Sequence, residues 1–131
     1  MAGVVVLDAN VLIALYDERD AHHAWARQFF VDTIADELCI SALTFAETLV
    51  RPTRAGVGEL FQAAIADVGI SVDPIDAFGA IQLATTRAES GLRMPDAVVL
   101  HTAQRRGGAL ATSDNTLAKA AIAAGITVFQ P

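Results

Sequence analysis

The sequence predicts an α/β protein: a single three-layer α/β/α domain, residues 1–131, around a central parallel sheet of four to five strands. Short apolar runs alternate with helical patterns almost throughout the chain, as in repeated βαβ units. The first run, residues 4–7, is entirely apolar and rich in β-branched residues, which is typical of a strand buried on both faces. A length of 131 residues suits one domain with one core.

Six elements are expected in the first half of the chain. They are a strand over residues 4–7, a helix over 10–16, a helix over 22–35, a strand over 38–40, a helix from Ser41 to near Arg51, and a helix over 59–68. Asp20 and Ser41 stand where helix N-caps are preferred, and Ile34 is expected among the apolar contacts of the second helix. Pro52 is expected to end the third helix, because proline disfavours helical backbone in the residue before it.

Six more elements are expected in the second half. They are a strand over residues 70–72, a helix from Asp76 to about Ser90, a helix from Pro95 to Arg106, a strand over 109–112, a helix over 116–124, and a strand over 127–129. Asp76 is placed to cap its helix and Gly91 to end it. The strands therefore continue to alternate with helices to the end of the sequence.

The composition argues against several classes of protein. No apolar run approaches the ~20 residues of a membrane-spanning helix, and no basic segment with a cleavage site opens the chain, so we expect a cytoplasmic protein. Cys39 is the only cysteine, which excludes an internal disulfide, fits a reducing compartment and suggests a small core residue. The hydrophobic content of 53% is high and suggests an apolar oligomer interface.

The net charge of −6, taken alone, argues against a nucleic-acid partner. Binding to phosphates normally draws on a basic surface. An acidic domain can still act on phosphates through a bridging cation, or can bind a basic protein segment.

Three acids share one structural context. Asp8 follows the first strand, and Asp114 follows the strand over residues 109–112. Asp96 begins an apolar helical stripe that is expected to face the sheet, which turns its carboxylate inward. Because strand C-termini and helix N-termini share one edge of a parallel sheet, all three acids are predicted to lie along that edge.

Glu47 is a fourth candidate, one turn into the helix after the second strand. It belongs to a polar stripe with Thr44, Thr48 and Arg51 on a helix that is otherwise apolar, so we expect the helix to be buried on most sides and the stripe to face water or a cleft. The same sheet edge lies within its reach.

Each of these acids has an ordinary structural explanation as a helix cap, a first-turn acid or a solvated side chain. Four carboxylates on one edge, however, repel one another and raise each other's pKa, which calls for a compensating cation. Oxygen ligands without cysteine or paired histidines favour Mg²⁺ or Mn²⁺ over Zn²⁺. No serine nucleophile motif and no glycine-rich phosphate loop competes with this interpretation.

Four segments resemble the motifs of the PIN-domain family, in particular its VapC-type toxins. The apolar strand with Asp8-Ala9-Asn10 resembles the first motif, Ser41–Glu47 the second, Pro95-Asp96-Ala97 the third, and Thr112-Ser113-Asp114 the fourth. The four acids follow one another at spacings of 39, 49 and 18 residues, and the resemblance spans nearly the whole chain. Many members carry another acid two residues after the fourth, where this chain has Thr116.

The resemblance implies a metal-dependent endoribonuclease, the toxin of a toxin–antitoxin pair, that hydrolyses RNA through water activated by Mg²⁺ or Mn²⁺. Asp8 and Asp96 are then expected to hold the metal most directly, and Glu47 and Asp114 to complete the catalytic site. Asn10 and Thr112 resemble residues that orient the carboxylates. The missing acid at Thr116 makes the role of Asp114 the least defined.

The resemblance also implies partners: an RNA substrate, with transfer RNA among the candidates, a cognate VapB-type antitoxin with a basic tail, and a homodimer. Side chains suggested as guides for the RNA backbone are Arg51, Arg54, Arg93, Arg105, Arg106 and Lys119. Side chains suggested as dimer contacts are Phe45, Leu49, Leu60 and Phe61, although core packing explains each of them as well.

Three alternatives stay open. A receiver-like signalling module would match the size, acidity and fold class, but it calls for paired acids after the first strand, where Asp8 is single. A phosphohydrolase with Asp8 as nucleophile calls for an acid two residues later, and Asn10 cannot transfer a proton. A PIN domain that only binds is disfavoured by the presence of all four acids.

Overall fold

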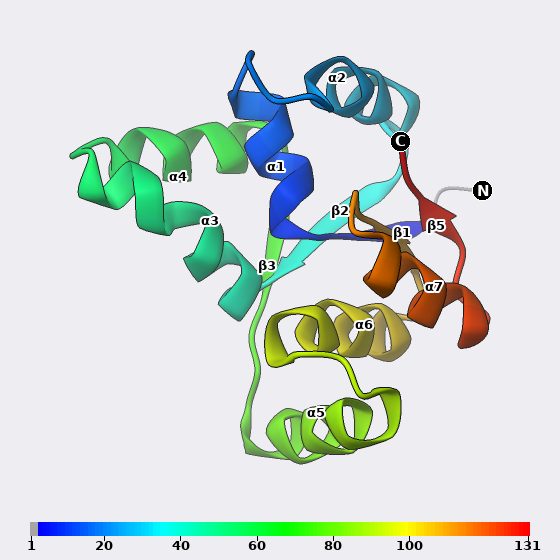
Figure 1. Ribbon diagram of the computed structural model, residues 1–131. Helices are drawn as coiled ribbons and strands as arrows, with labels where there is room; N and C mark the ends of the chain where they lie inside the picture. The colour runs from blue at the N-terminus through cyan, green and yellow to red at the C-terminus, as the bar shows by residue number, and fades with distance from the viewer. Residues whose placement is uncertain (1–2) are drawn as a thin grey trace.

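The computed structural model describes residues 3–131 and contains five strands and seven helices over that range (Figure 1). In chain order they are β1 Val4–Leu7, α1 Ala9–Tyr16, α2 His23–Asp32, β2 Glu37–Ser41, α3 Ala42–Arg54, α4 Gly58–Asp67, β3 Ser71–Asp73, α5 Ala77–Ser90, α6 Met94–Arg106, β4 Ala109–Ala111, α7 Asn115–Ala123 and β5 Val128–Phe129. Each predicted element is present, with ends that differ by a few residues.

The five strands form one parallel sheet in the order β3-β2-β1-β4-β5. The chain moves outward from β1 to β3 on one side and from β4 to β5 on the other. The direction of progression therefore reverses between β1 and β4, and in open α/β sheets ligands bind beyond the carboxyl ends of the strands at such a point. The predicted three-layer α/β/α class is confirmed.

Alternation along β1 divides the core between the two faces of the sheet. Val5 and Leu7 join a cluster with side chains of α1, α2 and α4, whereas Val6 joins a cluster with α5, α6 and α7. Successive side chains of a strand point to opposite faces, so an all-apolar strand must be covered on both. Figure 1 shows α1 to α4 on one side of the sheet and α6 and α7 on the other, with α5 packed against α6.

Two sequence predictions about helix ends are wrong. The second helix ends at Asp32 instead of residue 35, because the Thr33 N–H and hydroxyl both donate to the Phe29 carbonyl and the chain then turns. Ile34 is consequently 86% exposed and contributes nothing to the core. The third helix continues through Pro52 to Arg54, since the Ala55 N–H still donates to the Arg51 carbonyl at 3.0 Å.

The predicted caps were right at two of three positions. Ser41 Oγ accepts from the Leu43 N–H at 3.3 Å, and Asp76 Oδ1 accepts from the Gly79 N–H at 2.8 Å. Asp20 instead accepts from the His22 N–H, which closes the turn before α2 without capping the helix.

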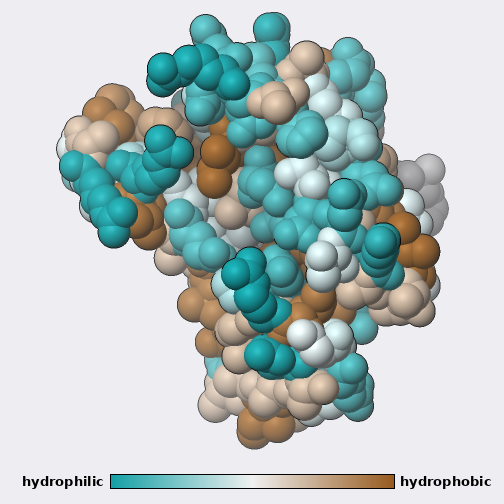
Figure 2. All heavy atoms as spheres, viewed as in Figure 1, coloured by the Kyte–Doolittle hydropathy of each residue, from teal (hydrophilic) through white to brown (hydrophobic). Residues whose placement is uncertain are grey.

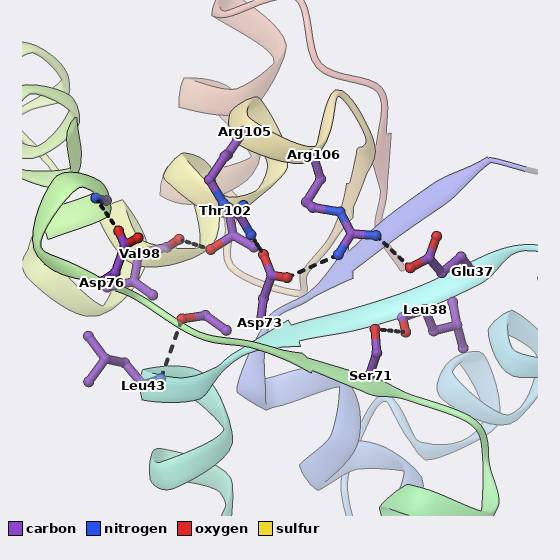
Figure 3. Close-up of polar contacts among 12 residues, drawn as sticks. Glu37, Leu38, Leu43, Ser71, Asp73, Asp76, Val98, Thr102, Arg105 and Arg106 are labelled. Atoms are coloured by element: carbon purple, nitrogen blue, oxygen red, sulfur yellow. Dashed lines mark hydrogen bonds and ion pairs between the residues drawn. The ribbon is translucent and has the colours of Figure 1, made fainter.

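A charged cluster fastens the edge strand β3 to the far end of α6 (Figure 3). Asp73, which is 9% exposed, pairs with Arg105 and, at 3.0 Å, with Arg106, and Arg106 also pairs with Glu37 of β2. Cys39 lies fully buried on β2, as expected of a core residue, and burial raises the pKa of its thiol. Within residues 3–131 no helix is long and apolar enough to cross a membrane.

Candidate active site

Asp8 lies at the switch point of the sheet, immediately after β1 and at the N-cap of α1. Its Oδ1 accepts from the Ala9 N–H at 2.7 Å, and its Oδ2 accepts from the Thr112 hydroxyl at 2.7 Å and from the Asn10 amide at 3.0 Å. A carboxylate has about four acceptor positions, so these three bonds leave Oδ1 with one acceptor position. Asp8 is therefore both a helix cap and a carboxylate of fixed orientation.

Thr112 connects the ends of the two central strands. Besides donating to Asp8, its Oγ1 accepts from the Asp114 N–H at 3.0 Å and from the Asn10 amide at 3.4 Å. Asn10 Oδ1 in turn accepts from the Ser113 N–H at 3.1 Å. The two residues that the sequence suggested as orienting groups thus form one hydrogen-bonded unit with Asp8, and Ser113 joins it through its backbone.

Asp114 and Asp96 approach Asp8 from two helix N-termini. Asp114 is the N-cap of α7 and accepts from the Leu117 N–H at 3.0 Å, while Asp96 lies in the first turn of α6. The pKa of Asp8 is raised to about 6, mainly by burial. The hydrogen bonds from Thr112 and Ala9 lower this pKa, and the charges of Asp96 and Asp114 raise it. Burial, and then the charge of Asp114, also raise the pKa of Asp96.

Glu47 completes the group from α3. Burial, and then the charge of Asp96, raise the pKa of Glu47, so its carboxylate lies within electrostatic reach of Asp96. The structure therefore brings together all four acids that the sequence singled out, Asp8, Glu47, Asp96 and Asp114. In Figure 2 hydrophilic side chains gather over the middle of the face that Figure 1 shows, between α3 and the helices α6 and α7.

The environment of α3 differs from the expected one. Thr44 and Thr48, predicted to face water or a cleft, are 0% and 5% exposed, and Thr44 Oγ1 has no hydrogen-bond partner among the described residues. Leu43 and Val50, on the side expected to be buried, are 47% and 44% exposed. The buried side of α3 therefore carries Thr44 and Thr48 together with the half-buried Phe45 and Leu49, and Leu43 and Val50 lie on its exposed side.

A groove beside the acids runs between α1 and α3. It has a volume of about 280 Å³ and is lined by Leu12, Ile13, Tyr16, Asp17, Glu47, Thr48, Arg51, Pro52, Ala55, Val57 and Phe61. The rings of Tyr16 and Phe61 meet edge to face, with centroids 5.4 Å apart. The groove is thus mainly apolar, and Glu47 is shared between it and the acidic group.

The basic side chains are divided between the two ends of α6. Arg105 and Arg106, suggested as guides for RNA, lie at its C-terminal end, where they form ion pairs with Asp73 and Glu37. Arg93 is the N-cap residue at the opposite end, and its charge lowers the pKa of Asp96. Of the suggested dimer contacts, Leu60 is 69% exposed, whereas Phe45 and Leu49 are half-buried against the core.

The four acids match the donor chemistry of a hard divalent cation. They supply only carboxylate oxygens, and burial, with the charges of neighbouring carboxylates, raises the pKa values of Asp8, Glu47 and Asp96. Among residues 3–131, no three His, Cys, Asp or Glu side chains are already arranged as ligands of one ion.

The family model described as PIN domain matches residues 5–123. The chain belongs to the PIN domain family. No curated protein matches this sequence.

A toxin–antitoxin complex from Klebsiella pneumoniae is 25% identical, with a TM-score of 0.71 over 84% of this chain and 86% of the other. Mycobacterium tuberculosis VapC20, described as a toxin that cleaves the sarcin–ricin loop, is 18% identical, with a TM-score of 0.73 over 97% and 99%. VapBC2 from Rickettsia felis bound to a promoter DNA fragment is 12% identical, with a TM-score of 0.69 over 98% of each chain. The last two likenesses establish the fold of this PIN domain.

Proposed function

We propose that this PIN domain is a VapC-type toxin, a divalent-cation-dependent endoribonuclease that hydrolyses phosphodiester bonds in RNA. The observation that carries the proposal is the convergence of Asp8, Glu47, Asp96 and Asp114 at the switch point of the sheet, with pKa values raised in three of them. Such a group is unfavourable for folding unless a cation neutralises it.

In this proposal Asp8 and Asp96 would hold Mg²⁺ or Mn²⁺, and Glu47 and Asp114 would complete the site directly or through water. When bound, the cation would supply a Lewis acid for the phosphate and would lower the pKa of water. Thr112 and Asn10 fix the orientation of the Asp8 carboxylate through their bonds to Oδ2.

The partner proposed for the apolar groove is a basic antitoxin. A helical segment of the antitoxin would cover Ile13, Tyr16 and Phe61, and a basic side chain after it would reach Glu47 and neutralise the acids. The toxin–antitoxin complex from Klebsiella pneumoniae supports a partner of this kind, and a homodimer through exposed apolar side chains is proposed with it.

The test is cleavage of total RNA, including transfer and ribosomal RNA, by purified protein free of antitoxin. Wild type, Asp96→Asn and the surface control Glu89→Gln are compared with Mg²⁺, with Mn²⁺ and with EDTA. We expect discrete products from wild type and Glu89→Gln that require the cation and disappear in Asp96→Asn.

Two results would contradict the proposed nuclease function. Cleavage by Asp96→Asn equal to that of wild type would assign the activity to a contaminant. No cleavage under any condition, together with tight RNA binding, would favour a PIN domain that only binds.

A further inference from the structure

The arginines at the two ends of α6 differ in whether they form ion pairs. Arg105 and Arg106 are held by Asp73 and Glu37 at the C-terminal end of α6 (Figure 3). Arg93, at the opposite end of the same helix, is exposed and forms no ion pair with any of residues 3–131. A strong cation is therefore available at the end of α6 that faces the acids.

The place of Arg93 is fixed by the start of α6. Its backbone is extended (φ −65°, ψ 156°), it is the N-cap residue, and its carbonyl accepts from the Ala97 N–H at 2.9 Å. Pro95 follows within the first turn, where its fixed φ suits the helix start. Arg93 thus stands three residues before Asp96 on a well-defined backbone, one turn from the acidic group.

Arg93 lies close to Asp96 in the chain without binding it. Within residues 3–131 the guanidinium forms no ion pair with Asp96 or with any other carboxylate. The five N–H donors of Arg93 therefore remain available for another anion.

We propose that Arg93 binds a phosphate of the RNA backbone next to the bond that is cut. The inference rests on the proposed nuclease function and assigns the substrate-binding cation of that site. A guanidinium can bind a phosphate through two parallel hydrogen bonds, which fixes its orientation as well as its position. This placement explains how a chain with net charge −6 can hold RNA beside four carboxylates.

The kinetic test compares wild type, Arg93→Gln, Arg93→Lys and Arg27→Gln on the RNA that wild type cleaves best. Arg27 is a matched control because it is exposed on α2, which packs on the opposite face of the sheet from α6. We expect Arg93→Gln to raise KM about tenfold at unchanged kcat, since one charge-assisted contact is lost from bound substrate and transition state alike. Arg93→Lys should recover part of the loss and Arg27→Gln should match wild type.

Binding gives a second readout that does not depend on turnover. In the Asp96→Asn background, Arg93→Gln should weaken binding of a fluorescein-labelled mixed-sequence RNA about tenfold and reduce its dependence on salt by roughly one phosphate contact. An active wild type with KM and RNA affinity unchanged by Arg93→Gln would overturn the role of Arg93 alone. An inactive wild type would overturn the proposed nuclease function. If Arg93→Gln in the Asp96→Asn background also left the RNA affinity unchanged, the role of Arg93 would be overturned as well.

Discussion

The Thr112 hydroxyl donates to Asp8 Oδ2 at 2.7 Å and accepts from the Asp114 N–H at 3.0 Å, across two adjacent parallel strands. One side chain therefore sets the distance between two of the four acids. Because Thr112 is fully buried, neither bond is exchanged with solvent.

Replacing Thr112 by valine should remove both bonds while keeping the shape of the side chain. We expect kcat/KM to fall about 10- to 100-fold, as for the loss of groups that orient metal ligands, and the free energy of unfolding to fall by about 1–3 kcal/mol. Cleavage assays and urea denaturation measure the two effects. Thr112→Ser keeps the hydroxyl and should retain most activity; equal activity of the valine and serine variants would show that the hydroxyl does not matter.

Activity should fall as the pH drops below about 6, because the pKa of Asp8 is raised to about 6 and only its ionised form can hold a cation. A cation competes with the proton, so a higher Mg²⁺ concentration should move the midpoint of the pH–rate profile to lower pH. Profiles recorded at low and high Mg²⁺ measure the shift. A midpoint that is independent of Mg²⁺ would argue that Asp8 is not a ligand.

Mg²⁺ should stabilise the protein more at pH 7.5 than at pH 5. The folded-state pKa of Asp8, about 6, lies above its ordinary value of 3.8, so between these values the folded state binds more protons and the free energy of unfolding falls as pH rises. The loss from Asp8 alone is about 3 kcal/mol. A bound cation offsets this loss of stability only where the Asp8 carboxylate is ionised, so the increase in Tm with Mg²⁺ should nearly vanish at pH 5. An equal increase in Tm at pH 5 and pH 7.5 would refute the proposed cation site.

Asp73→Ala should lower the free energy of unfolding by about 2–4 kcal/mol, because it leaves two half-buried arginines without their common partner. Asp17→Ala removes an exposed pair with Arg19 and should cost less than about 1 kcal/mol. Urea denaturation of both variants gives the comparison. Equal losses would mean that the pairs of Asp73 contribute no more than a surface pair.

Gly108→Ala should be among the most destabilising single-atom additions. A Cβ at this position would lie 2.6 Å from the Val4 carbonyl oxygen, so the start of β4 would have to move away from β1, at a cost of about 2 kcal/mol or more. Gly58→Ala meets mainly the rotatable hydroxyl of Thr53, at 2.9 Å, and should cost less. Thermal denaturation separates them, and a neutral Gly108→Ala would show that the strands can separate without loss.

The sequence by itself determined the alternation of strands and helices. An apolar β-branched run indicates a buried strand, and an apolar stripe at helical spacing indicates a helix, and both patterns are visible within a short stretch of chain. It also placed Asp8, Asp96 and Asp114 at one sheet edge, since parallel strands have only one carboxyl end. It failed at Pro52, where α3 continues to Arg54, and at Ile34, where the chain turns after Thr33 and leaves this side chain exposed.

Only the tertiary structure decided which cations are free and which acids interact. The sequence alone does not distinguish among the six suggested basic residues. In the structure Arg105 and Arg106 pair with Asp73, which lies more than thirty residues away in the chain, whereas Arg93 does not pair with Asp73. The joint hydrogen bonding of Thr112 with Asp8 and Asp114 likewise depends on β4 lying beside β1. Electrostatic interactions fall with distance in space, and distance in space between residues far apart in the chain is set by packing.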